Sequence, residues 1–341
     1  MQLNRRLMAL VATTFGDVSD VLILRALGLG DFLTGVPAYR GLRQGFPEAT
    51  ITLAAPAALE PLARLTGAID RLLPVNGLGE LTAVTLSTPS PPPDLAVNLH
   101  GAGPESIGDV VATGARRILT HRHPQYRLIS GPEWCEDIHE VERWTRLLAL
   151  EGIPADPTGL GLARPTEVPV IPDAVIVHPG ASAQARRWPV NRFAKVARSL
   201  ALDGHQVVIT GSVAERPRCL DVARLADLGT GCVLAGELDL GGLAALVAAA
   251  RLVISGDTGI AHLASAYATP SVILFGPTSP MRWGPPAGGP FTVIWRGYTG
   301  DPHSRSAHPA LLEIGSDEVL QAAVSRLGGS TPQLATPTIS R

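Results

Sequence analysis

The stretch from Leu252 to Leu263 constrains the fold of this chain more than any other part of its sequence. It opens on a short apolar run, Leu252 to Ile254, which predicts a buried strand. Ser255 to Gly259 has the small residues of a tight turn, and Ile260 to Ala268 predicts a helix. A second strand is expected over Ser271–Phe275. These pieces form a βαβ unit, whose turn lies at the carboxyl edge of a parallel sheet.

The turn of this unit predicts a site for an anionic ligand. N–H groups at a helix N-terminus have no partner within the helix, and they carry a partial positive charge. Thr258 can add a hydroxyl donor, and His262 lies one turn further along the same helix face. The carboxylate of Asp257 would repel a phosphate, so we expect it to cap the helix or to accept hydrogen bonds from sugar hydroxyls. Taken alone, the stretch also fits an ordinary capped helix with an unrelated histidine.

Short apolar strands and amphipathic helices alternate along the rest of the chain, which predicts a doubly wound, mostly parallel α/β fold. Further strands are expected at residues 21–24, 49–55, 70–75, 94–99, 117–120, 174–178, 206–210 and 232–234. Residues 152–173 are rich in Pro, Gly and Thr, which is the composition of a linker. We therefore expect two Rossmann-like domains facing a central cleft. The first domain is expected over residues 1–165, of which 1–20 form an extension. The second domain is expected over residues 170–327, and a tail follows over 328–341.

Composition excludes several classes of function. The formal net charge is −2 and the pI is near 6.5, so no general basic field predicts binding to nucleic acid or to an anionic membrane. The three cysteines form no CxxC or Cys/His cluster, which argues against a disulfide framework and against a zinc site. No apolar run approaches the roughly 20 residues that span a bilayer. We expect a cytoplasmic protein with at most peripheral contact with a membrane.

The loop after the first strand, Gly28–Gly35, carries a candidate general base. It partly matches a dinucleotide-binding loop, but Leu33 stands where that fingerprint needs glycine. The second strand also ends in Ala54-Ala55-Pro56, without the acid that would bind a ribose. Asp31 stands at a helix start beside the expected cleft. There it can cap the helix or accept a proton from an incoming hydroxyl group, and the sequence leaves both roles open.

The loop after the strand at 174–178 has the residue types of a phosphate site. Ser182 lies in a run of small residues, and Arg186 and Arg187 follow it. A guanidinium group presents a fork of donors that suits phosphate oxygens, so two arginines at this edge favour a phosphate ligand over a merely solvated surface. Glu215, in the loop after the next strand, can be a charge at a helix start or an acceptor for a ribose diol.

Taken together, these loops resemble the ADP-heptose:lipopolysaccharide heptosyltransferases, which are glycosyltransferase family 9. The resemblance spans about residues 21–327. Its specific marks are Gly28-Leu-Gly-Asp31, Arg186-Arg-Trp-Pro189, and Ser255–Leu263 leading to Phe275-Gly-Pro-Thr278. It implies a GT-B fold, with the acceptor bound mainly by the first domain and the nucleotide-sugar by the second. It also implies transfer of a heptose from ADP-heptose with inversion, without a cofactor and without a metal.

The resemblance assigns roles to single residues. Asp31 matches the catalytic base, and Arg186 stands where the family usually has a lysine that binds the donor phosphates. The other donor-binding positions that it implies are Ser182, Thr258 and Gly259 at the phosphates, Glu215 at the ribose, Leu238 with its backbone at the adenine, Asp257 towards the sugar, and His262. Arg187 is a further donor-binding candidate, proposed from the chemistry of its loop.

The sequence leaves the acceptor open. Candidates on its side are Gly30 and, with low rank, His100, His139, Glu140 and Arg143. A lone histidine is more often structural than functional. The segment Tyr298–His308 departs from the cysteine-containing stretch of many family members. The acceptor is therefore either the lipopolysaccharide core or a small natural product such as an aminoglycoside. A GT-B nucleotide-sugar epimerase and a non-catalytic nucleotide-binding protein are the alternative functions.

Overall fold

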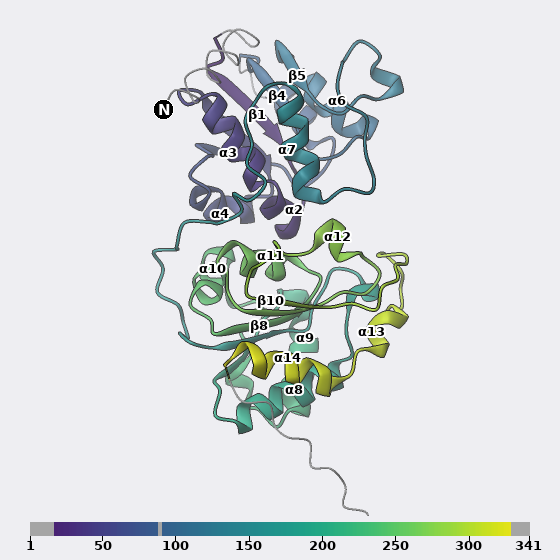
Figure 1. The fold of residues 1–341 in the computed structure, drawn as a ribbon. Coiled ribbons are helices and arrows are strands. Elements are labelled where there is room, and N and C mark those ends of the chain that lie inside the picture. The colour runs from purple at the N-terminus through teal and green to yellow at the C-terminus, as the bar shows by residue number, and fades with distance from the viewer. Residues whose placement is uncertain (1–16, 88–90, 329–341) are drawn as a thin grey trace, which may run out of the picture.

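The computed structural model describes residues 17–87 and 91–328 and shows two α/β domains, one above the other in Figure 1. Each domain has a five-stranded sheet whose neighbouring strands are all parallel. Most of the expected N-terminal extension and C-terminal tail, residues 1–16 and 329–341, lies outside the described residues. Within the described ranges, no helix is both long enough and apolar enough to span a bilayer.

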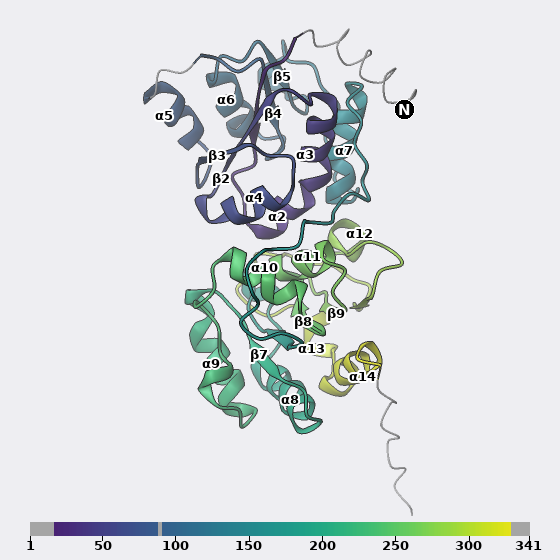
Figure 2. The same ribbon diagram turned by 90° about the vertical axis from the view of Figure 1, so that its left-hand side faces the viewer.

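The first sheet has the strand order β3-β2-β1-β4-β5. Its strands are β1 (Asp20–Leu24), β2 (Thr50–Ala55), β3 (Arg71–Pro74), β4 (Leu95–Asn98) and β5 (Arg117–Leu119). The helices of this domain are α2 (Leu29–Thr34), α3 (Val36–Gly45), α4 (Glu60–Leu65), α5 (Glu80–Ser87), α6 (Pro104–Ala112) and α7 (Glu140–Leu150). Figure 2 shows α5 and α6 on one side of the sheet and α3 and α7 on the other. Because helices cover both faces, the residues of β1 from Val21 to Leu24 are all buried.

The second sheet has the strand order β10-β9-β8-β6-β7. Its strands are β6 (Val175–His178), β7 (Val207–Ile209), β8 (Leu252–Gly256), β9 (Ser271–Leu274) and β10 (Phe291–Ile294). The helices of this domain are α8 (Val190–Leu202), α9 (Arg216–Leu225), α10 (Leu240–Ala248), α11 (Gly259–Ala266), α12 (Pro280–Trp283), α13 (Pro309–Glu313) and α14 (Ser316–Arg326). The βαβ unit predicted from the sequence is β8, α11 and β9, so that prediction is confirmed.

One expectation for the second domain is wrong. The stretch 232–234 is not a strand, because only Val233 pairs with the sheet, in a single bridge to Ile209 of β7. The Gly/Pro-rich segment 276–300 contains two elements that were not predicted from the sequence, α12 and the edge strand β10. In the first domain, the amphipathic pattern of residues 136–151 predicts a helix over that whole range, whereas α7 begins only at Glu140.

The topology places the carboxyl ends of the strands at a shared opening. The strand order reverses between β1 and β4 in the first sheet, and between β6 and β8 in the second. Such switch points leave a crevice beyond the carboxyl ends of the strands, where α/β proteins bind ligands. Residues 151–174, which carry no helix or strand, connect α7 of the first domain to β6 of the second. Within this segment, the backbone N–H of Ala163 donates a hydrogen bond to the carbonyl of Leu65 at 2.9 Å.

Helices α2 and α11 hold the two domains close together. At Gly259, the first residue of α11, an added Cβ would lie only 2.8 Å from the Cβ of Leu29 in α2. At Gly30, an added Cβ would lie 3.0 Å from Cδ2 of His262. Both positions therefore need glycine for the two helices to approach this closely. The approach brings the first turn of α2, with Asp31, beside α11.

Candidate active site between the two domains

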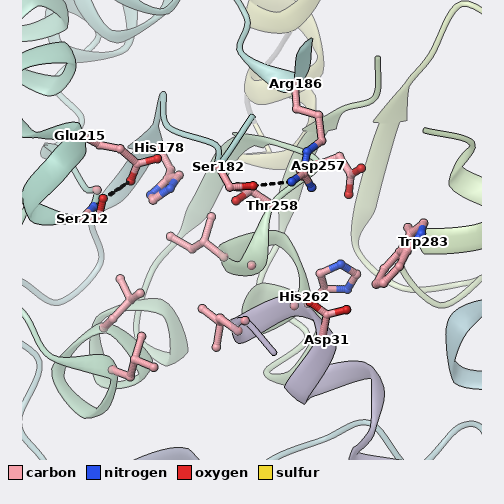
Figure 3. A pocket seen from close by; sticks show the side chains of 18 of the residues that line it. Asp31, His178, Ser182, Arg186, Ser212, Glu215, Asp257, Thr258, His262 and Trp283 are labelled. Carbon is pink, nitrogen blue, oxygen red and sulfur yellow. Dashed lines mark hydrogen bonds between the residues drawn. The ribbon is translucent and has the colours of Figure 1, made fainter. Parts of the chain in front are cut away.

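A cavity of about 1330 Å³ lies between the domains, and loops at the carboxyl ends of both sheets line it. The first domain contributes the start of α2, and the second contributes the loops after β6, β7 and β8 together with α12. Figure 3 shows charged and polar side chains from both domains pointing into this space. Of the residues proposed from the sequence, ten line the cavity: Gly30, Asp31, Ser182, Arg186, Glu215, Leu238, Asp257, Thr258, Gly259 and His262.

Asp31 is the carboxylate that the first domain brings to the centre of the cavity. It lies in the first turn of α2, and its side chain is 33% exposed. The N-cap residue of α2 is Gly28, which has no side chain to accept a capping hydrogen bond, so Asp31 is not the N-cap of this helix. Burial raises the pKa of Asp31, although the guanidinium of Arg25 opposes this rise. A carboxylate with a raised pKa is a stronger base than an ordinary aspartate.

Arg186 provides the cation on the opposite wall. Its Nη2 donates a hydrogen bond to Oγ of Ser182 at 2.5 Å, and its Nη1 donates to the carbonyl of Asp257 at 3.3 Å. These contacts hold the guanidinium in place between the loops after β6 and β8. Its Nε atom is buried without a hydrogen-bond partner. An anionic ligand in the cavity would meet a cation that is held in a fixed position.

The N-terminus of α11 points into the same part of the cavity. Thr258 is its N-cap residue, and no side chain accepts the hydrogen bonds of its first turn. Asp257 is not the N-cap residue, so of the two roles expected for it, capping of this helix is excluded. Figure 3 shows Thr258 beside Ser182 and Arg186. The N–H groups of the first turn and the hydroxyl of Thr258 can therefore bind an anion next to Arg186.

Asp257 is buried behind this helix end, with 4% of its surface exposed. Burial raises its pKa to about 6, although Arg186 and a hydrogen bond involving Thr278 oppose the rise. The carboxylate is therefore ionised at neutral pH at a cost to the folded state.

We expect Asp257→Asn to stabilise the protein near neutral pH. The unfolded chain has the ordinary pKa of 3.8 and the folded protein about 6. The cost of ionisation is therefore complete above pH 6 and disappears as the pH falls towards 4. Removing it should add about 3 kcal/mol at about pH 7.5 and clearly less at about pH 5, measured by thermal unfolding. Asp203→Asn, at an exposed position after α8, is the control. A variant less stable than the parent at the higher pH would contradict the prediction.

Glu215 lies further along the cavity, in the loop after β7. Its Oε2 accepts hydrogen bonds from the backbone N–H and the hydroxyl of Ser212, at 2.8 and 2.9 Å. This capping box shows that Glu215 serves a helix start, one of the two roles that the sequence allowed. His178 and Leu238 line the cavity near it. His178 was not anticipated, and its Nδ1 lies 3.0 Å from the hydroxyl of Thr210.

His262 joins the two walls of the site. Figure 3 shows its ring beside Asp31 and Trp283. Its centroid is 6.0 Å from that of Trp283, in an edge-to-face arrangement. Burial lowers the pKa of His262 to about 4, so the imidazole is neutral at physiological pH. It can therefore exchange hydrogen bonds with a ligand without adding charge. Trp283 was missed from the sequence, although Ser279-Pro280 is a recognisable helix start before it.

Three residues expected at the site lie outside the cavity. Arg187 donates from Nε to the carbonyl of Ala181 at 2.7 Å, and so supports the loop instead of facing the ligand space. His139 caps α7, because its Nδ1 accepts the N–H of Val141 at 3.2 Å, and its Nε2 lies 3.0 Å from the carbonyl of Gly284 in the other domain. His100 follows β4, and burial lowers its pKa to about 4.

Sequence reasoning also missed Arg25 as part of the site. Its side chain is fully buried directly behind Asp31, and its Nη2 lies 4.0 Å from Oδ1 of that residue. The sequence does contain a signal for Arg25, since this arginine directly follows an apolar strand. A charged side chain buried there requires partners, which points to a group of charged residues beside it. The described ranges, 17–87 and 91–328, contain no group of three or more His, Cys, Asp or Glu side chains placed to hold a metal ion.

Comparison with known proteins agrees with this geometry. The sequence model of glycosyltransferase family 9 (heptosyltransferase) matches residues 136–308, about half of the chain. Lipopolysaccharide heptosyltransferase 2 of Escherichia coli K12 is 26% identical over 297 residues, which cover 76% of this chain and 83% of the relative. Lipopolysaccharide heptosyltransferase 2 of Salmonella typhimurium is 25% identical over 90% of this chain and 98% of its own.

Two solved structures share the fold. ADP-heptose lipopolysaccharide heptosyltransferase II of E. coli superposes with a TM-score of 0.75 at 24% identity, covering 90% of this chain and 98% of that one. A family 9 glycosyltransferase of Veillonella parvula superposes with a TM-score of 0.76 at 21% identity, covering 92% and 98%. The predicted GT-B fold of two Rossmann-like domains is thus confirmed. This chain belongs to glycosyltransferase family 9, the heptosyltransferase family, and is a glycosyltransferase.

Proposed function

We propose that this protein is an inverting glycosyltransferase that moves a heptose, or a related sugar, from an ADP-sugar to a hydroxyl group of a saccharide-type acceptor. One observation carries the proposal. A single cavity holds the carboxylate of Asp31 on one wall and, on the other, Arg186 with the uncapped N-terminus of α11. The first is suited to removing a proton, and the second to holding a diphosphate.

The proposed reaction is one in-line displacement. Asp31 takes the proton of the acceptor hydroxyl as its oxygen attacks the anomeric carbon of the donor sugar. The bond between that carbon and the diphosphate oxygen breaks, and ADP leaves with the bonding electrons. Arg186 and the N–H groups at Gly259 stabilise the charge that develops on the leaving phosphate. The proposal needs no cofactor and no metal for these steps.

The nucleotide fits the other half of the cavity. Glu215 and His178 provide polar groups for the ribose, and leucines at 234, 238, 240 and 243 provide an apolar wall for the adenine. This arrangement supports the division of labour in which the second domain, expected over 170–327, binds the donor. The first domain, expected over 1–165, then binds the acceptor near Asp31 and Trp283.

Two classes of acceptor fit the proposal. The relatives named above are lipopolysaccharide heptosyltransferases, which favours a lipopolysaccharide core saccharide. Thr299, Gly300, Pro302 and His303, however, line the cavity, and all four belong to the segment that departs from the usual family sequence. This observation favours an altered acceptor, such as an aminoglycoside. The proposed location is cytoplasmic, with at most peripheral contact with a membrane that carries a lipid-linked acceptor.

The test is to incubate the purified full-length protein with ADP-heptose and either a lipid A–Kdo core or a set of aminoglycosides. We expect release of ADP and a glycosylated product, detected by mass spectrometry, with one of the two classes and also in the presence of EDTA. Donor alone should remain unchanged. An epimerised donor would favour the epimerase alternative. ADP binding by calorimetry without consumption of donor would favour the non-catalytic one.

A further inference from the structure

Behind Asp31, on the side away from the cavity, lies a buried group of charged residues that the proposed mechanism does not use. It consists of Arg25, Glu140 and Arg143, whose side chains are 0%, 11% and 1% exposed. Arg25 comes from the end of β1, whereas Glu140 and Arg143 come from the first turn of α7. None of the three lines the cavity.

Arg25 is bound tightly to the segment that carries Asp31. Its Nε donates to the carbonyl of Asp31 at 2.5 Å, and its Nη2 donates to the hydroxyl of Thr34 at 3.0 Å. Its Nη1 donates to the carbonyl of Leu99. Its Nη2 also lies 4.0 Å from the carboxylate of Asp31, longer than a hydrogen bond. The cation therefore fixes the backbone of α2 and leaves the carboxylate of Asp31 free.

Glu140 is the group that neutralises Arg25. Its Oε1 accepts a hydrogen bond from Nη2 of Arg25 at 3.3 Å and another from Nε1 of Trp144 at 2.8 Å. Its Oε2 accepts a hydrogen bond from Nε of Arg143 at 3.1 Å. Both oxygens have donors, so the carboxylate is held in one orientation. Arg25 also lies over the ring of Trp144, 4.8 Å from its centroid.

Removing Glu140 would change the partner of Arg25. A buried guanidinium without a counter-ion is costly, so it attracts the nearest remaining carboxylate. That carboxylate is Asp31, at 4.0 Å. An aspartate held in an ion pair is a weaker base, and it points away from the acceptor.

We propose that Glu140 is a positioning residue for the transfer reaction: by pairing with Arg25 behind the site, it leaves the carboxylate of Asp31 free to face the acceptor hydroxyl. This inference rests on the proposed role of Asp31 as the base. The sequence had ranked Glu140 only as a weak candidate on the acceptor side. Glu140 does not line the cavity, so it acts on Asp31 only through Arg25.

The pH profile of transfer by Glu140→Gln tests the proposal. The negative charge of Glu140 raises the pKa of Asp31, and the charges of Arg25 and Arg186 lower it. Further titratable groups near Asp31 are Tyr39, Asp257 and the neutral His262. Around Glu140 itself lie Arg25, Arg143, His121 and His262. Losing only the charge of Glu140 should therefore move the acid limb of kcat/KM to lower pH, and lower kcat roughly tenfold or more. The KM for the donor should not change.

The matched control is Glu142→Gln, an exposed position on the same helix. It should reproduce the parent profile, and an ADP titration shows that each variant is folded. An acid limb that does not move in Glu140→Gln would overturn the proposal. If that variant does not fold, Glu140→Asp replaces it. The shorter side chain keeps the charge but withdraws from Arg25, so kcat should fall while the acid limb stays in place. An unchanged kcat in that variant would also overturn the proposal.

The two proposals fail in different ways. If Asp31→Asn retains normal transfer, Asp31 is not the base, and the role of Glu140 falls with it. If Asp31→Asn loses transfer while Glu140→Gln behaves like Glu142→Gln, only the positioning role is wrong.

Discussion

Asp31→Asn is expected to lower the rate of glycosyl transfer by about 10²- to 10⁴-fold, the range that a general base contributes. Asparagine has nearly the same shape as aspartate but cannot accept the proton of the acceptor hydroxyl. The nearest charged partner of the Asp31 carboxylate is Arg25, whose Nη2 lies 4.0 Å from Oδ1. The hydrogen bond that the carboxylate accepts comes from the backbone N–H of Asp31 itself, and the amide oxygen of asparagine can accept it equally well. The measurement is initial-rate ADP release with saturating donor and acceptor.

The affinity for ADP is the internal check on this prediction. The groups proposed to bind the nucleotide lie across the cavity from Asp31, so calorimetry should give the parent Kd in Asp31→Asn. Glu48→Gln, at an exposed position before β2, is the control for a change of one charge on the same domain. Normal turnover by Asp31→Asn would exclude Asp31 as the base. Loss of ADP binding together with transfer would indicate a general loss of structure.

The sequence predicted the parts of the fold that local pattern determines. The apolar run at 252–254, its glycine turn and the small-residue helix after it are all properties of neighbouring residues, and the structure confirms them. Nine of the ten strands in the described part of the chain follow runs that were recognisable in the same way. The exception is β10, whose four residues lie between proline- and glycine-rich loops and pair only at the edge of the sheet. Its strand conformation depends on its pairing with β9.

Several site residues depended on contacts that no local pattern reveals. Arg25 and Glu140 are separated by 115 positions, and they become partners only because α7 packs against α3, beside the end of β1. Arg186 and Arg187 are adjacent and chemically identical, so their spacing could not show which one faces the ligand. A short 3-10 turn at Gln184–Arg186 directs one into the cavity and the other towards the carbonyl of Ala181.

Arg186→Ala is expected to weaken ADP binding by about tenfold to a hundredfold, because charge-assisted hydrogen bonds contribute about 1.5–3 kcal/mol each. The guanidinium is held in place by Ser182 and by the carbonyl of Asp257, and its Nε has no protein partner. Little other structure depends on it. Arg186→Lys keeps the charge but loses the fork of donors, so it should lose clearly less affinity than Arg186→Ala.

Arg187→Ala is the matched control, since it removes the same side chain from the next position. Arg187 lies outside the cavity, so this variant should bind ADP with the parent affinity. Calorimetric titration of the three variants and the parent, at one ionic strength, measures the difference directly. Equal losses in Arg186→Ala and Arg187→Ala would mean that the local positive charge, and not the placement of one guanidinium, attracts the diphosphate. No loss in Arg186→Ala would place the diphosphate elsewhere and leave the uncapped end of α11 without its proposed ligand.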